Sequence, residues 1–118
     1  MLIKKFEDLI VWEKSHRLTL DIYLKTKCFP KEELFGLVSQ IRRSSMSICA
    51  NIAEGQRKST KDFSRFLQIS LGSLEETKYY LILSRDLQYI SLSEFTELFQ
   101  RAEDIGRMLT GLRNKLIF

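Results

Sequence analysis

Few side chains in this sequence have the chemistry of a catalyst or a metal ligand. His16 is the only histidine, and Cys28 and Cys49 stand alone, without CxxC spacing. A nucleophile needs an adjacent base, and a metal site needs several clustered ligands. Glu54 and Glu76 lie among small or apolar residues, where paired acids could perform acid–base chemistry, but a helix-end contact and an interhelical hydrogen bond explain them more simply. We therefore expect no catalytic residue, metal site or cofactor.

Basic residues, in contrast, gather in one stretch. The net charge of the chain is +4. Between residues 40 and 65, six basic residues stand against only Glu54 and Asp62, so this stretch holds the whole excess. The six are Arg42, Arg43, Arg57, Lys58, Lys61 and Arg65. Such a concentration predicts a nucleic-acid-binding surface, because arginine and lysine neutralise phosphates. The alternative is a solubilising surface without a ligand.

The element that must position the first of these residues is a helix over residues 40–55. Its core stripe repeats at offsets of three and four and consists of Ile41, Ser45, Ile48 and Ile52, continued backwards by Leu34, Leu37 and Val38. A second stripe is short and mostly uncharged, namely Gln40, Ser44, Ser47, Asn51 and Glu54. Short side chains predict the close approach of another helix or of another copy of the chain. The alternative is a partly exposed helix, and Gly55 is expected to end it.

The spacing of apolar residues predicts four helices and no strand. They are expected over residues 6–26, 30–55, 60–87 and 92–116. Ser91 and Glu94 have the spacing of a capping box at the start of the last helix. In the first helix, charges of alternating sign every four residues from Glu13 to Lys25 predict an exposed edge. Since the connections are short, the fold class is all-α, an antiparallel up-down four-helix bundle forming one domain over residues 1–118.

The first and third helices carry more apolar surface than one core can bury. The first has a stripe of Leu9, Trp12, Leu20 and Tyr23 beside a stripe of Val11, Leu18 and Ile22. The third has Ile69, Tyr80, Leu83 and Leu87 nearly opposite its core residues. These surplus stripes predict a homo-oligomer whose contacts repeat by symmetry. The residues assigned to its interface, or to tight packing, are Ser44, Ser47, Ala50, Asn51, Glu54, Ser73 and Glu76.

The start of the chain does not look like a targeting or membrane segment. Charged residues recur every few positions through MLIKKFEDLIVWEK, and no other apolar run approaches spanning length. We therefore expect a cytoplasmic protein with no membrane partner.

Several short motifs together resemble a known family. They are Phe6-Glu-Asp-Leu9 with Val11-Trp12, Phe29-Pro30, Gln40-Ile-Arg-Arg43, Ser47-Ile48, Asn51-Ile-Ala-Glu-Gly55, Gly72-Ser-Leu74 and Glu76. Over essentially its whole length, the chain resembles the four-helix bundle proteins encoded in 23S rRNA intervening sequences. The resemblance implies a bacterial protein that assembles as a ring-shaped homopentamer. It also implies kinship with the accessory variability determinant of diversity-generating retroelements, which works with a reverse transcriptase and binds nucleic acid through a basic surface.

Charge, periodicity and resemblance lead to one functional expectation. The protein is expected to be a non-catalytic oligomer that binds RNA or DNA weakly, without sequence readout, through the six basic residues between 40 and 65. A reverse transcriptase or another protein is a candidate partner. The alternative is a purely structural or protein-binding scaffold with no nucleic-acid partner.

Overall fold

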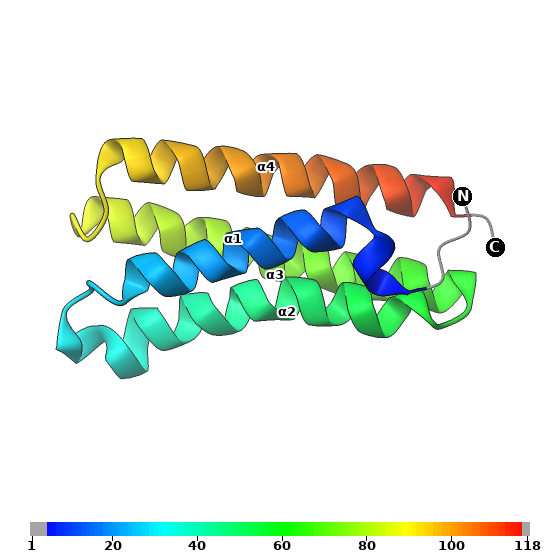
Figure 1. The fold of residues 1–118 in the computed structure, drawn as a ribbon, viewed down its shortest axis with the longest axis horizontal. Coiled ribbons are helices and arrows are strands. Elements are labelled where there is room, and N and C mark those ends of the chain that lie inside the picture. Colours follow the sequence, from blue (N-terminus) through cyan, green and yellow to red (C-terminus); the bar gives the residue numbers. More distant parts are fainter. Residues whose placement is uncertain (1–4, 117–118) are drawn as a thin grey trace.

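Apolar residues at helical spacing lie on four long helices in the computed structural model, which describes residues 5–116. The helices are α1 (Ile10–Thr26), α2 (Ser39–Gln56), α3 (Thr60–Asp86) and α4 (Leu92–Lys115). Neighbours run antiparallel and no strand occurs among the described residues (Figure 1). The predicted fold class, an all-α antiparallel four-helix bundle, is therefore confirmed.

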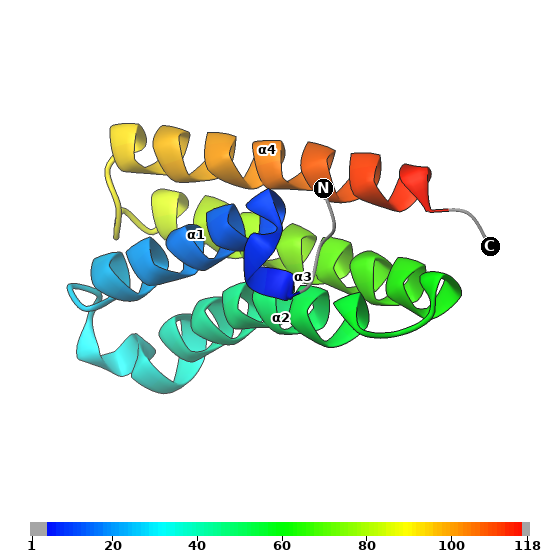
Figure 2. The same cartoon turned by 45° about the vertical axis from the view of Figure 1, so that its right-hand side comes forward.

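The four helices occupy the corners of the bundle in chain order. α1 packs on α2 and α4, and α3 packs on the same two helices, so α1 and α3 are diagonal neighbours. Figures 1 and 2 show the α1–α2 connection and the α3–α4 connection at the same end of the bundle. The turn between α2 and α3 and the last turn of α4 lie together at the other end. The end of α2 and the end of α4 therefore lie at the same end of the bundle, although they are far apart in sequence.

The stripes that the sequence predicts for α2 and α4 belong to the core. Ile41, Ser45, Ile48 and Ile52 of α2 are all buried. From α4, the buried residues are Leu98, Ala102, Ile105 and Leu109. Burying such side chains stabilises the fold by about 1.5–3 kcal/mol for each large aliphatic residue. None of the helices described by the structure is apolar over the length that a membrane span requires.

The first helix begins later than predicted. Residues Phe6–Asp8 form a separate 3-10 turn, and Leu9 is extended with φ −81° and ψ 124°. α1 starts only at Ile10. The break has a packing reason, because Leu9 turns inward and is 7% exposed, whereas Ile10 points to solvent. Burial of one leucine thus decides where the continuous helix begins.

The second helix also begins later than Pro30. A 3-10 turn over Lys31–Glu33 is followed by a π-helical segment over Leu34–Val38. Within that segment Gly36 has φ −110° and ψ −110°, outside the helical region. Glu33 holds the distortion, since its carboxylate accepts hydrogen bonds from the Leu37 N–H at 3.3 Å and from the Tyr89 hydroxyl at 2.9 Å. The irregular segment is therefore tied to the connection between α3 and α4.

Of the two apolar stripes predicted for the first helix, one belongs to the core and the other contributes only Leu9 to it. Val11, Leu18 and Ile22 are buried. On the other stripe, Trp12 and Tyr23 are half-buried and Leu20 is 54% exposed. Buried hydroxyl residues complete the core face of α1 in place of the second stripe, namely Ser15, Thr19 and Thr26. A surplus apolar stripe therefore remains on the surface of α1.

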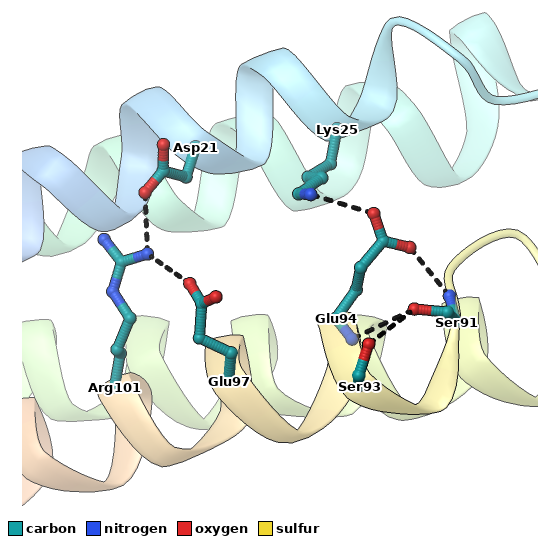
Figure 3. A network of polar contacts seen from close by, with 7 residues as sticks. All are labelled: Asp21, Lys25, Ser91, Ser93, Glu94, Glu97 and Arg101. Atoms are coloured by element: carbon teal, nitrogen blue, oxygen red, sulfur yellow. Dashed lines mark hydrogen bonds and ion pairs between the residues drawn. The ribbon is translucent and has the colours of Figure 1, made fainter.

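Ion pairs join α1 to α4 along one side of the bundle (Figure 3). Lys25 Nζ lies 2.8 Å from the Glu94 carboxylate, and Arg101 Nη1 lies 2.6 Å from Asp21. Asp21 and Lys25 therefore pair across the seam, although the predicted edge had them exposed on α1. Glu94 also accepts a hydrogen bond from the Ser91 N–H at 2.8 Å and donates its own N–H to Ser91 Oγ at 3.1 Å. The predicted capping box is confirmed, and its carboxylate bridges two helices.

Candidate nucleic-acid interface

The turn between α2 and α3 is short, is held by hydrogen bonds and carries basic side chains. Only three residues, Arg57–Ser59, separate the two helices. Ser59 caps α3, because its Oγ accepts a hydrogen bond from the Asp62 N–H at 3.3 Å. The Lys58 N–H donates to the Gly55 carbonyl at 2.9 Å. Arg57 and Lys58 are therefore exposed at the apex of a connection with little freedom of its own.

Gly55 has a different role from the predicted one. It lies inside the last turn of α2, which continues to Gln56, so the prediction that Gly55 ends the helix is wrong. A Cβ at this position would lie 2.5 Å from the Cβ of Phe66. Glycine is required because α3 crosses α2 at close range. This close crossing brings the first turns of α3, with Lys61 and Arg65, against the end of α2.

The basic residues of this region differ in how far they are already paired. Arg65 Nε lies 3.9 Å from the Asp62 carboxylate, and the Arg65 guanidinium carbon lies 5.0 Å from the centre of the Phe66 ring. Within residues 5–116, no ion pair involves Arg57, Lys58 or Lys61. All three are exposed. They are therefore available to an anionic ligand.

The last turn of α4 adds two basic residues that the sequence analysis missed. α4 ends beside the α2–α3 turn (Figure 1). Arg113 Nε donates to Ser64 Oγ at 3.2 Å, which ties α4 to the start of α3. The basic end is defined here as Arg57, Lys58, Lys61, Arg65, Arg113 and Lys115. In an antiparallel bundle the fourth helix must end where the second helix ends. The predicted topology could therefore have placed Arg113 and Lys115 at this end.

Arg42 and Arg43 do not belong to the basic end. They lie on α2, 14 or more residues before Arg57, which corresponds to about 21 Å at 1.5 Å per residue. Arg42 is engaged by α1: its Nε donates to Thr26 Oγ1 at 2.9 Å, and its guanidinium carbon lies 4.6 Å from the centre of the Tyr23 ring. The six basic residues named from the sequence therefore do not form one surface.

Most of the short polar residues of α2 face α3 of the same chain. Ser44 Oγ and Thr77 Oγ1 are 2.8 Å apart, and so are the Oγ atoms of Ser47 and Ser73. Asn51 Nδ2 donates to the Ser47 carbonyl at 2.8 Å. The sequence left open whether another helix or another copy of the chain approaches these short side chains. For these serines it is another helix of the same chain, α3.

The remaining residues of that set point outward. Ala50, Glu54 and Glu76 are exposed. Glu76 accepts a hydrogen bond from the Tyr80 hydroxyl at 3.3 Å, a contact within α3 rather than the expected bond between helices. Ala50 and Glu76 thus lie on surfaces that a second molecule could reach.

The side chains with the most reactive chemistry are dispersed. His16 is exposed and stacks on Trp12, with ring centres 5.0 Å apart and planes inclined by 11°. Burial raises the pKa of the Cys49 thiol, whose sulfur lies 3.6 Å from Thr19 Oγ1. A raised pKa keeps a thiol protonated and weakly nucleophilic. Among residues 5–116, no group of three or more His, Cys, Asp and Glu side chains is placed to hold a metal ion.

Four antiparallel helices with short turns and one basic end define a small helical-bundle protein. The chain belongs to the 23S rRNA-intervening sequence protein family, whose model matches residues 7–111. A solved structure from Bacteroides thetaiotaomicron VPI-5482, described as a protein with unknown function from the S23 ribosomal protein family, has the same fold. It is 30% identical to this chain, covers 90% of this chain and 96% of its own length, and superposes with a TM-score of 0.81. No curated protein matches the chain. The resemblance seen in the sequence motifs is thereby confirmed.

Proposed function

We propose that this protein is a non-catalytic, oligomeric cytoplasmic protein that binds RNA or DNA weakly through its basic end. The observation that carries the proposal is the group of exposed cations Arg57, Lys58 and Lys61, which lack ion-pair partners within the described chain. Exposed cations in close proximity attract polyanions, because each phosphate contact releases condensed counterions.

The proposed surface is suited to phosphates rather than to bases. Its residues lie on a three-residue turn and at helix ends, so no helix projects from it to enter a groove of a duplex. In the proposed homo-oligomer, symmetry repeats the surface, and five copies would carry a formal charge of about +20. An enzyme acting on the same strand, such as a reverse transcriptase, is the protein partner that this activity would serve.

The test is fluorescence anisotropy with a labelled single strand and a labelled duplex at increasing salt. We expect binding that falls with salt by a log–log slope near −0.7 to −0.9 for each phosphate neutralised, with little effect of sequence. The variant Arg57→Gln/Lys58→Gln/Lys61→Gln should bind more weakly and with a flatter slope. The matched control Lys14→Gln/Lys27→Gln/Lys31→Gln removes the same charge from exposed positions of α1 and of the segment after it, and should change binding less.

Two results would count against this function. One is the absence of binding to either ligand at low salt. The other is equal loss of affinity in the two triple variants, which would make total charge, and not the basic end, the determinant.

The second candidate is a structural or protein-binding scaffold without a nucleic-acid partner. It is favoured by an apolar groove of about 460 Å³ between α1 and α2, because apolar surface open to solvent is typical of protein contacts. A protein that assembles normally and fails both binding tests would be assigned to this class.

A further inference from the structure

A small pocket opens on the side of the bundle where α1 packs on α4. It has a volume of about 130 Å³ and is lined by Lys14 and Arg17 of α1 and by Arg101, Asp104 and Ile105 of α4. Ile105 is only 1% exposed, so the core backs the pocket. The other lining residues are three cations and one acid, which leaves a formal charge of +2 on the walls.

Helical spacing brings these residues together. Lys14 and Arg17 are three positions apart on α1, and Arg101 and Asp104 are three positions apart on α4, so each pair lies on one face of its helix. The ion pair of 2.6 Å between Asp21 and Arg101 fixes the register of the two antiparallel helices. Arg17, one turn before Asp21, therefore faces the turn of α4 that follows Arg101.

Arg101 is held through a single nitrogen atom. Its Nη1 donates hydrogen bonds to Asp21 at 2.6 Å and to Glu97 at 3.2 Å. Figure 3 shows both contacts ending on this nitrogen, with the other two nitrogens on the side away from Glu97. Neither Nε nor Nη2 has a hydrogen-bond partner in the part of the chain that the structure describes. Together they form the edge of a guanidinium that binds two oxygens of a phosphate or carboxylate.

The two cations of α1 also keep donors free. Lys14 is exposed and has no ion pair within residues 5–116. Arg17 contacts Glu13 through Nε at 3.2 Å and through Nη2 at 3.0 Å, which leaves its Nη1 for another acceptor. An ammonium and a guanidinium nitrogen of α1 can therefore approach the same ligand as the edge of Arg101.

The acids around the pocket are already paired. Asp104, the acid in the wall, accepts a hydrogen bond of 2.6 Å from Arg107. Glu13, Asp21 and Glu97 each pair with an arginine and do not line the pocket. The donors that face the pocket thus meet less negative charge than the sequence around them suggests.

We propose that this pocket binds a phosphate group through the free edge of Arg101 and through Lys14 and Arg17. A phosphate monoester carries close to two negative charges and three strong acceptor oxygens, which suits three separate cations better than a carboxylate does. Arg101 lies 14 residues before Lys115, about 21 Å along α4, so the pocket is apart from the basic end. The inference therefore does not depend on the function proposed for that end.

The test is a nuclear magnetic resonance titration of the protein with inorganic phosphate, with the ionic strength held constant by chloride. We expect saturable shifts in the backbone amides of residues 14–17 and 101–105 and in the Arg101 Nε–H signal. Chloride alone should cause none of them, because it cannot accept from both nitrogens of the guanidinium edge.

Two variants and a matched control assign the contacts. Lys14→Gln/Arg17→Gln changes two exposed residues and should weaken phosphate binding about tenfold. Arg101→Lys keeps the charge beside Asp21 but lacks the edge with two nitrogens, so it should also bind more weakly. Lys27→Gln/Lys31→Gln removes the same charge as the first variant from other exposed positions and should bind as the wild type does. Circular dichroism verifies that each variant is folded.

A phosphate group can belong to a small molecule or to the end of a strand, and two further ligands separate these sources. They are a nucleoside 5′-monophosphate and a single strand with or without a 5′ phosphate. If the pocket takes strand ends, the 5′ phosphate should strengthen strand binding, and Lys14→Gln/Arg17→Gln should abolish that gain. If it takes small molecules, the monophosphate should bind there and the 5′ phosphate should not matter to the strand.

Three results would overturn the inference. The first is the absence of saturable shifts at the pocket, including the case in which phosphate shifts only residues of the basic end. The second is equal weakening in Lys14→Gln/Arg17→Gln and in Lys27→Gln/Lys31→Gln, which would make total charge the determinant. The third is a folded Arg101→Lys variant with wild-type affinity, which would mean that the guanidinium edge makes no contact.

Discussion

At the scale of single residues, short side chains in this protein serve two distinct purposes. The serines of α2 and α3 meet in hydrogen bonds of 2.8 Å between Ser44 and Thr77 and between Ser47 and Ser73. At Gly55 there is no side chain at all, which makes room for Phe66 where α3 crosses α2. Gly111, by contrast, lies inside α4 with nothing within 4 Å of an added Cβ. Two helical glycines thus stand in opposite environments.

This difference predicts opposite effects of alanine at the two positions. Gly55→Ala should destabilise the fold by about 1–3 kcal/mol, because the new methyl group forces Phe66 and the backbone of α3 to move. Gly111→Ala should stabilise it by about 0.5–1 kcal/mol, because alanine is the better helix former and meets no neighbour. Urea denaturation followed by circular dichroism measures both. If Gly55→Ala were as stable as the wild type, the crossing of α2 and α3 would have to be looser than described.

At the scale of helices, ion pairs join α1 to α4, whereas hydrogen bonds between hydroxyl groups join α2 to α3. Glu94 is the centre of that contact (Figure 3), since one carboxylate both caps α4 through Ser91 and pairs with Lys25. The hydrogen bond from Lys25, followed by that from the Ser91 N–H, lowers the pKa of Glu94 from 4.5 to about 2. A lowered pKa means that the folded state favours the ionised carboxylate.

The pKa of Glu94 predicts how the stability of this seam depends on pH. Its contribution is fully present above the unfolded value of 4.5 and is lost as the pH falls towards about 2. Glu94→Gln should therefore cost about 0.5–1 kcal/mol at neutral pH, a difference that shrinks on acidification. Melting temperatures of the two proteins across this pH range measure the effect. Glu32→Gln is the control, because Glu32 is exposed and has no ion pair within residues 5–116. A difference between wild type and Glu94→Gln that stayed constant with pH would contradict the assignment.

At the scale of the molecule, the two ends of the bundle differ in charge. Six cations form the basic end, against Glu54 and Asp62 nearby. The opposite end mixes both signs, with Lys27, Lys31 and Arg85 beside Glu32, Glu33 and Asp86. The side of the bundle between α1 and α2 carries the apolar groove. The surface proposed for nucleic acid is therefore separate from this exposed apolar surface.

This separation predicts opposite responses to salt. The wild type should have the mass of several copies, with five expected from the family resemblance, and should keep that mass in high salt because its contacts are mainly apolar. Binding to a labelled strand should decline over the same range because phosphate contacts are screened. Light scattering and anisotropy on the same samples compare the two. Dissociation of the oligomer in parallel with the loss of binding would instead indicate an interface held by charge.

The sequence by itself determined the helices and their order. Residues of α2 and α4 recur at three and four positions over long runs, and Ser91 with Glu94 marks a helix start chemically, so local pattern was sufficient. It did not determine where α1 and α2 begin. Burial of Leu9 and the contact of Glu33 with Tyr89 fix those starts, and both depend on distant parts of the chain.

Only the tertiary structure decided which of the marked residues share a surface. Arg42 and Arg57 belong to one basic stretch in sequence, but the helical rise separates them, and Arg42 is bound by α1. Arg113 joins the basic end because antiparallel packing returns α4 to the α2–α3 turn. The stripe of short residues on α2 was likewise visible in the sequence, but the sequence did not show that α3 packs against it. A helical pattern of short or apolar residues predicts that a helix face is covered. Whether another part of the same molecule covers that face depends on how the whole chain packs.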